Sequence, residues 1–334
     1  MALRLIEMVV REEEGDDLRD LLKEQRLLEH RQLRLTDSEV LVRILLDAEQ
    51  SEAVLDLLAQ QYSGSEGHRI VILPVEATLP RAEPEPDDVS EPLPTEEKVP
   101  ERVSREELYE DVKNSAECSH VYLAMTALST VLAAIGLHHN SVAIIIGAMV
   151  IAPLLGPNMA LALSTTLGDL SLLRRAGLTI LAGIATIIIL SMIIGVLLPV
   201  DTTLSEITLR TQVELGDVVL ALAAGCAGAL AFTTGVSAAL IGVMVAVALL
   251  PPLVTFGLLL GGGQHELAVV ALLLFVLNLI CVNLAGVTTF LIQGIRPVTW
   301  WEKDRAVNAT RIAIGLGVVL LAGLIGIIFL LRKG

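Results

Sequence analysis

Residues 146–157 read IGAMVIAPLLGP, and residues 241–252, which lie 95 positions further along the chain, read IGVMVAVALLPP. Seven of the twelve positions are identical without a gap. The same offset relates the apolar segments on either side of each stretch, although identity there falls to scattered matches. The sequence therefore predicts two copies of a three-helix unit. Because three crossings are an odd number, the second copy would be inverted in a bilayer, and inverted repeats with Pro- or Gly-interrupted helices are typical of secondary transporters.

The first copy carries signals for a broken helix. Pro153 and Pro157 remove backbone donors and oppose a continuous helix, and Gly156 allows the chain to leave helical geometry. We expect the break near the middle of the bilayer, with a second half-helix that starts at Pro157 and Asn158. The positive end of that half-helix would face the midplane, and together with a matching end in the second copy it would favour an anion or the carboxylate of a small solute. The alternative is that the prolines only kink packed helices.

In the second copy, Pro251 and Pro252 predict a matching break, with Thr255 one turn beyond it. Asn278 and Asn283 are the amides of the following apolar segment. Each either bonds to a neighbouring helix or lines a path. No Asp or Glu lies at a segment centre, which disfavours a carboxylate proton relay.

The composition is that of a membrane protein, with 54% hydrophobic residues and a mean hydropathy of +0.70. A spanning helix needs about 20 mostly apolar residues. Seven segments meet that length, and they predict about seven transmembrane helices: 119–137, 141–167, 176–199, 217–234, 236–260, 267–293 and 310–331. Segments 141–167 and 236–260 either cross fully or form re-entrant loops.

Loop charge predicts the orientation. If every segment crosses and the N-terminus is cytosolic, the cytosolic loops hold most of the basic residues, including Arg174 and Arg175. This fits the positive-inside rule. We therefore expect a multi-pass protein of the prokaryotic cell (inner) membrane with a cytoplasmic N-terminal domain.

The N-terminal part predicts a small soluble domain. Residues 1–79 alternate strand and helix patterns in the order β-α-β-β-α-β, which is the ferredoxin-like arrangement. Residues 80–103 are an acidic, Pro-rich linker. Ser104 and Glu107 form a capping-box pattern that begins a juxtamembrane helix over 104–118. The transmembrane domain then occupies 119–334, and the N-terminal domain is expected to regulate or assemble it.

Charge and motif content exclude several functions. Residues 1–115 carry 29 acidic and 14 basic side chains, and residues 116–334 carry nine of each. An acidic head disfavours nucleic acid as a partner. No catalytic motif appears, so we expect no enzyme activity and no cofactor. His138 and His139 alone are too few ligands for a metal site.

The residues also resemble a known family. The stretch from Asn140 through Pro157, followed by Gly168 and Asp169, resembles the signature of the uncharacterised hydrophobic domain family, domain of unknown function 389. Residues 104–109 and 5–10 resemble its prokaryotic branch with a small N-terminal domain. The resemblance implies a prokaryotic integral membrane protein and brings no established activity with it.

These observations together predict a membrane transporter or channel for a small solute or ion, embedded in the lipid bilayer as a homo-oligomer. The broken backbone at Pro153, Gly156 and Pro157 would coordinate the solute, and Asn158 would donate and accept hydrogen bonds. The alternative is a membrane-anchored sensor or scaffold whose N-terminal domain binds a ligand or partner.

Overall fold

The computed structural model describes residues 3–62 except 24, 26 and 37, then 69–75, 78, 103–234 and 238–295, with isolated positions between 315 and 326. The chain divides into two units, Met1–Leu108 and Tyr109–Gly334, and the division falls within helix α3 (Arg105–Ser115). The predicted linker over 80–103, apart from Val103, and most of the predicted segment 310–331 lie outside the described residues.

The first unit is a four-stranded sheet with two helices, in the element order that the sequence predicts. Its neighbouring strands are all antiparallel, in the spatial order β2-β3-β1-β4. The elements are β1 (Leu3–Arg11), α1 (Glu12–Leu21), β2 (Glu29–Arg34), β3 (Glu39–Asp47), α2 (Ala48–Tyr62) and β4 (Ile70–Val75).

Alternating side chains build the core of this unit. In β1, Ile6, Met8 and Val10 are buried, whereas the residues between them are only partly so. The buried side chains pack with Leu18 of α1 and Leu58 of α2 in one hydrophobic cluster. A strand places successive side chains on opposite faces, so this alternation is what lets one face hold the core.

The predicted capping box at the start of α3 is only half formed. The Ser104 hydroxyl accepts a hydrogen bond from the Glu107 N–H at 3.2 Å, as expected of an N-cap. The Glu107 carboxylate instead accepts two hydrogen bonds from the Arg4 guanidinium, each 2.8 Å long. A bidentate pair with a nearly buried arginine is stronger than a hydrogen bond to a backbone N–H. Glu107 therefore pairs with Arg4 of β1 instead of completing the cap.

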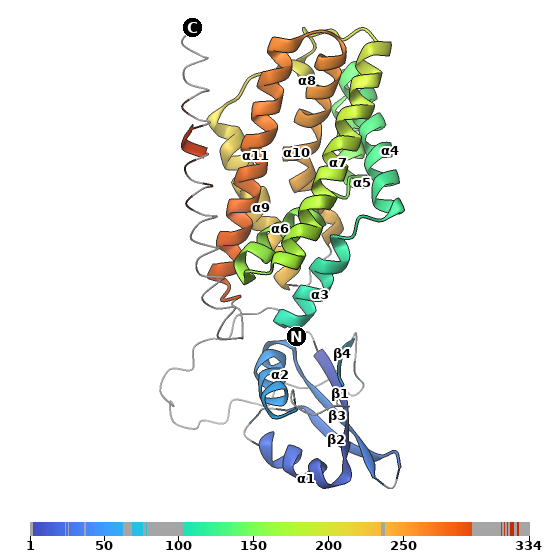
Figure 1. Ribbon diagram of the computed structural model, residues 1–334, viewed down its shortest axis with the longest axis vertical. Helices are drawn as coiled ribbons and strands as arrows, with labels where there is room; N and C mark the ends of the chain where they lie inside the picture. The colour runs from blue at the N-terminus through green and yellow to red at the C-terminus, as the bar shows by residue number, and fades with distance from the viewer. Residues whose placement is uncertain are drawn as a thin grey trace. The chain divides into compact units, whose positions relative to one another are not determined.

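The second unit is a helical bundle in which the long helices α7, α9, α10 and α11 alternate in direction (Figure 1). Helix α4 packs on α5 and α7, and α9 packs in the same way on α10 and α11; α10 also packs on α7, and α11 on α6. The helices are α4 (His120–His138), α5 (Val142–Ile151), α6 (Leu155–Leu167), α7 (Leu170–Leu197), α8 (Ser205–Thr208), α9 (Leu215–Thr234), α10 (Ala238–Gly261) and α11 (His265–Ile292).

Among the described residues, four helices are long and apolar enough to cross a membrane, or five if the bent pair α5–α6 is one span. The four are α4, α7, α9 and α11. Helix α10 has 24 residues, and the part of it that the structure describes without interruption, Val245–Gly261, is apolar. The bundle is therefore compatible with a membrane protein. Four or five of the predicted spans are present among the described residues, and the count of seven stays a prediction.

The predicted break in segment 141–167 is present. Helix α5 ends at Ile151, α6 begins at Leu155, and the two are bent by 54°. Ala152 is extended (φ −71°, ψ 117°) because the ring of a following proline, here Pro153, disfavours helical geometry in the residue before it. The prediction that the second half-helix starts at Pro157 is wrong by two residues, since Pro157 lies in its first turn, where a missing N–H costs least.

The predicted break at Pro251 and Pro252 is wrong. Both prolines lie inside α10, which continues to Gly261. Pro252 has no N–H for the carbonyl of Ala248, but the Asn278 side chain on α11 donates Nδ2–H to that oxygen at 2.8 Å. A neighbouring helix thus replaces the lost hydrogen bond, so the chain need not unwind to satisfy the carbonyl.

Candidate functional site

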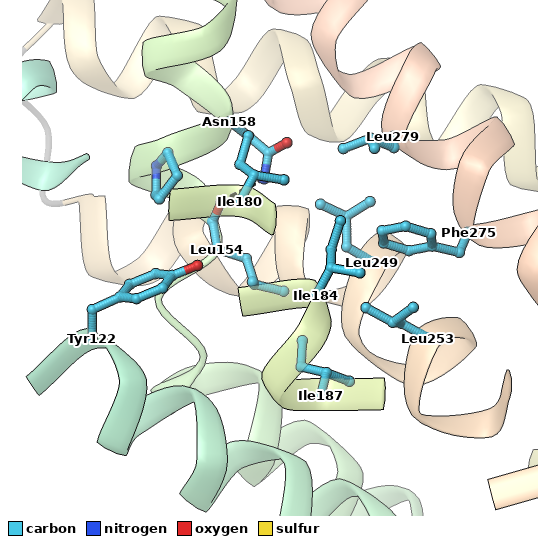
Figure 2. A pocket seen from close by; sticks show the side chains of 11 residues that line it. Tyr122, Leu154, Asn158, Ile180, Ile184, Ile187, Leu249, Leu253, Phe275 and Leu279 are labelled. Carbon is cyan, nitrogen blue, oxygen red and sulfur yellow. Dashed lines mark hydrogen bonds between the residues drawn. The ribbon is translucent and has the colours of Figure 1, made fainter. Parts of the chain in front are cut away.

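The helix break lies beside a small cavity inside the bundle. Its volume is about 20 Å³, which is room for about one water molecule. Figure 2 shows Tyr122 of α4 and Phe275 of α11 on opposite sides of it. The cavity is lined by Tyr122, Leu154, Pro157, Asn158, Ile180, Ile184, Ile187, Leu249, Leu253, Phe275 and Leu279.

Eight of these eleven residues form four pairs whose members are 95 positions apart in the chain. This is the offset of the two copies of the repeat. The pairs are Leu154 with Leu249, Asn158 with Leu253, Ile180 with Phe275, and Ile184 with Leu279. Equivalent positions of both copies therefore meet at one point, and only the pair of Asn158 and Leu253 combines a polar with an apolar side chain.

Asn158 is the hydrogen-bonding centre of the site, and its residue is 2% exposed. Its Nδ2 donates to the Leu154 carbonyl at 2.7 Å, at the start of α6. Its Oδ1 accepts from Asn283 Nδ2 at 3.2 Å, and the same nitrogen donates to Leu279 O at 2.9 Å. Asn283 Oδ1 is buried and has no hydrogen-bond partner among the described residues.

The remaining predicted residues lie around this centre rather than in it. Gly156 lies against Ser115 at the end of α3, where a Cβ would meet that residue's backbone and side chain. Pro153 is partly buried next to the break, and Asn278 bonds to Ala248 rather than lining the cavity. Thr255 is fully buried in α10, and its hydroxyl has no partner in the described part of the chain.

Pro251 and Pro252 are buried inside α10 and do not line the cavity. The structure thus brings together Pro157, Asn158 and Asn283, and it places the second proline pair elsewhere. Nor do any three His, Cys, Asp or Glu side chains of the described residues come close enough to hold a metal ion.

Tyr122 is a site residue that the sequence reasoning missed. Its hydroxyl donates to the Thr179 carbonyl of α7 at 3.2 Å. It occupies a notch left by Gly183, where a Cβ would overlap the hydroxyl oxygen. The position 95 residues later is Asp217, which does not line the cavity, so the repeat gives no signal for Tyr122.

A polar junction holds the loop between α6 and α7. The Asp169 carboxylate caps α7 by accepting from the N–H groups of Ser171 and Leu172, and it also accepts from the hydroxyls of Ser171 and Tyr109. Burial opposes ionisation of Asp169, but these hydrogen bonds outweigh it and hold its pKa below the ordinary value. Burial and the bond to Asp169 raise the pKa of Tyr109 to about 12, so the phenol remains a donor at neutral pH.

These features define a class of protein: a bundle of membrane-length apolar helices, with a broken helix at an internal cavity, that follows a small α+β unit. The chain belongs to the family described as Domain of unknown function (DUF389), which matches residues 149–284. That range contains every lining residue of the cavity except Tyr122.

The chain is also 39% identical over 279 residues to Uncharacterized protein MJ0678 of Methanocaldococcus jannaschii, and the similarity covers 84% of each chain. No solved structure matches the chain.

Proposed function

We propose that this protein moves a small solute across the prokaryotic cell membrane through two inverted three-helix units that meet at the cavity. The observation that carries the proposal is the lining of the cavity by equivalent residues of both copies, beside the broken helix. In secondary transporters with inverted repeats, the solute site lies at the repeat interface and is formed by discontinuous helices.

Contacts outside the cavity support the same symmetry. Gly257 of α10 lies against Ser191 of α7, and Gly286 of α11 lies against Ala162 of α6. By the offset of 95, Ser191 is equivalent to Gly286, and Ala162 is equivalent to Gly257. A two-fold axis that exchanges the copies would turn the first contact into the second. The alternating directions of the long helices agree with such an axis (Figure 1).

In this proposal the structure is an occluded state. A cavity of about 20 Å³ holds about one water molecule, and a solute needs the two units to separate on one side or the other. The three-helix units would rock about the fixed site, as inverted repeats do in alternating access.

The first unit would be a ferredoxin-like module in the cytosol that regulates or assembles the membrane part. Its strand order and antiparallel pairing support the fold assignment. The basic residues near the α6–α7 loop, Arg174 and Arg175 in the second turn of α7, support the cytosolic side.

Thiol labelling tests alternating access without knowledge of the solute. Native Cys281 is buried in α11 and does not line the cavity, whereas Leu279, two residues earlier, does. In a chain with Cys118→Ser and Cys226→Ser, Cys281 should resist a membrane-impermeant thiol reagent added to either side. Leu279→Cys combined with Cys281→Ser should react from each side. If the thiol introduced by Leu279→Cys is unreactive from both sides, the helices only pack, and the anchored sensor or scaffold becomes the better account.

A further inference from the structure

Resting on the proposed function, we propose that the solute is small and uncharged, with one end that forms hydrogen bonds and one end that is apolar. The charge and the asymmetry of the cavity point to this class. Each of these is a property of the lining side chains.

No lining residue carries a charge at neutral pH. The acidic and basic residues of 116–295 occupy loops and helix ends, so none can neutralise an ion at the cavity. An unpaired ion in an apolar environment is strongly disfavoured, and membrane proteins that carry ions place charged side chains or rings of carbonyls along the path. The site offers one lining amide and one phenol instead, which favours an uncharged ligand over an ion.

Both lining residues with hydrogen-bonding side chains, Tyr122 and Asn158, belong to the first copy of the repeat. Where the first copy has Asn158, the second has Leu253. Asn158 is joined by Asn283, and the buried Oδ1 of Asn283 has no partner in the described part of the chain. An amide can form four hydrogen bonds, and the lining amide of Asn158 forms two, so this side has capacity for a solute that donates one. Leu253, Leu249 and Phe275 offer only apolar contact to the other end.

Two probes of nearly equal shape separate the alternatives. Acetamide has one amide end and one methyl end, whereas urea has a second amino group in place of the methyl. In proteoliposomes, osmotic swelling should show the protein-dependent flux of acetamide above that of urea by about fourfold, the factor expected for burying one methyl group. Flux through protein-free vesicles is subtracted, and the flux should not depend on an imposed membrane potential.

A gain-of-function variant guards against loss through misfolding. Leu253→Asn places an amide on both sides of the axis, so the urea-to-acetamide flux ratio should rise by about fourfold or more. Asn158→Leu removes the polar side and should lower the flux of both amides, by about fivefold for one lost hydrogen bond. Asn114→Ala, which changes an exposed amide of α3, should leave both fluxes unchanged.

The outcomes distinguish this inference from the proposed function. Flux of sodium or chloride that follows the membrane potential and falls in Asn158→Leu would overturn the uncharged solute while retaining transport. The absence of protein-dependent flux for either amide, or an unchanged ratio in Leu253→Asn, would also overturn it. Transport itself is judged by thiol labelling at position 279, which needs no solute.

Discussion

Helix α10 remains continuous, we argue, because Asn278 replaces a hydrogen bond that Pro252 cannot make. The Ala248 carbonyl is buried, and Asn278 Nδ2 is 2.8 Å from it. An unsatisfied buried carbonyl costs roughly 1–3 kcal/mol, whereas side-chain hydrogen bonds measured in membranes average ~0.6 kcal/mol and reach ~1.7 kcal/mol. Asn278→Leu also removes a buried Oδ1 without a partner among the described residues, which offsets part of the loss. We therefore expect a net destabilisation of about 1 kcal/mol.

A double-mutant cycle makes this expectation specific. Pro252→Leu restores an N–H at position 252, which can donate to Ala248 O as in an ordinary helix turn. In that background Asn278→Leu should cost nothing or stabilise, so the coupling free energy is about 1 kcal/mol. Equilibrium unfolding in mixed micelles, followed by circular dichroism, measures all four variants. Equal losses in both backgrounds, within the ~0.3–0.5 kcal/mol typical of independent sites, would refute the reasoning.

Three further predictions follow from the packing, the loop junction and the topology. Gly183→Ala should destabilise the bundle by roughly 1–3 kcal/mol in thermal unfolding, because the added Cβ displaces the Tyr122 hydroxyl, and the loss should shrink in a Tyr122→Phe background. Folding lowers the pKa of Asp169, so its ionised carboxylate stabilises the protein above about pH 4. This stabilisation should disappear as the pH falls through the folded pKa. Asp169→Asn should therefore flatten that part of a profile of melting temperature against pH. Cysteines introduced at Leu170 and Glu266 should label from opposite sides of the membrane, and same-side labelling would remove the inverted relationship.

Local patterns were enough to predict the elements of the first unit. Each signal belongs to a single segment: alternate residues are buried in β1, and apolar residues recur at helical spacing around Leu18 in α1 and around Leu58 in α2. The order of strands and helices therefore follows from the sequence. The pairing of Glu107 with Arg4 does not follow, since the partners are 103 residues apart. The capping box is a local rule, and a long-range ion pair overrides half of it here.

The same distinction separates the two proline stretches. The break before α6 is local, because Pro153 itself forces Ala152 out of helical geometry. The continuity of α10 has a non-local cause, because the hydrogen-bond donor for the Ala248 carbonyl is Asn278, 30 residues later in the chain. Proline removes a donor in both stretches, and only the tertiary structure determines whether another group replaces it.

The cavity could be predicted from the sequence only in part. The break beside it follows from Pro153 and Pro157, and the offset of 95 was already visible in the sequence. Applied residue by residue, that offset pairs Ile180 with Phe275 and Ile184 with Leu279, but nothing in the sequence says that these pairs face each other. Packing supplies that information, and it also brings in Tyr122, whose counterpart in the repeat, Asp217, does not line the cavity.

The two copies differ at one pair of positions that lines the cavity with a polar residue in one copy and an apolar residue in the other. Three of the four lining pairs remain apolar in both copies, and the fourth, Asn158 with Leu253, differs beside the break. Ala248 stands where the first copy has Pro153, so the copy that keeps Leu253 also keeps a continuous helix. A single break and a single amide on the same side give the two ends of a bound solute different surroundings. The inward-open and outward-open forms differ in which of the two units plays each role. One unit has a broken helix with a polar residue, and the other has a continuous helix with an apolar residue. We therefore expect the two forms to differ in free energy.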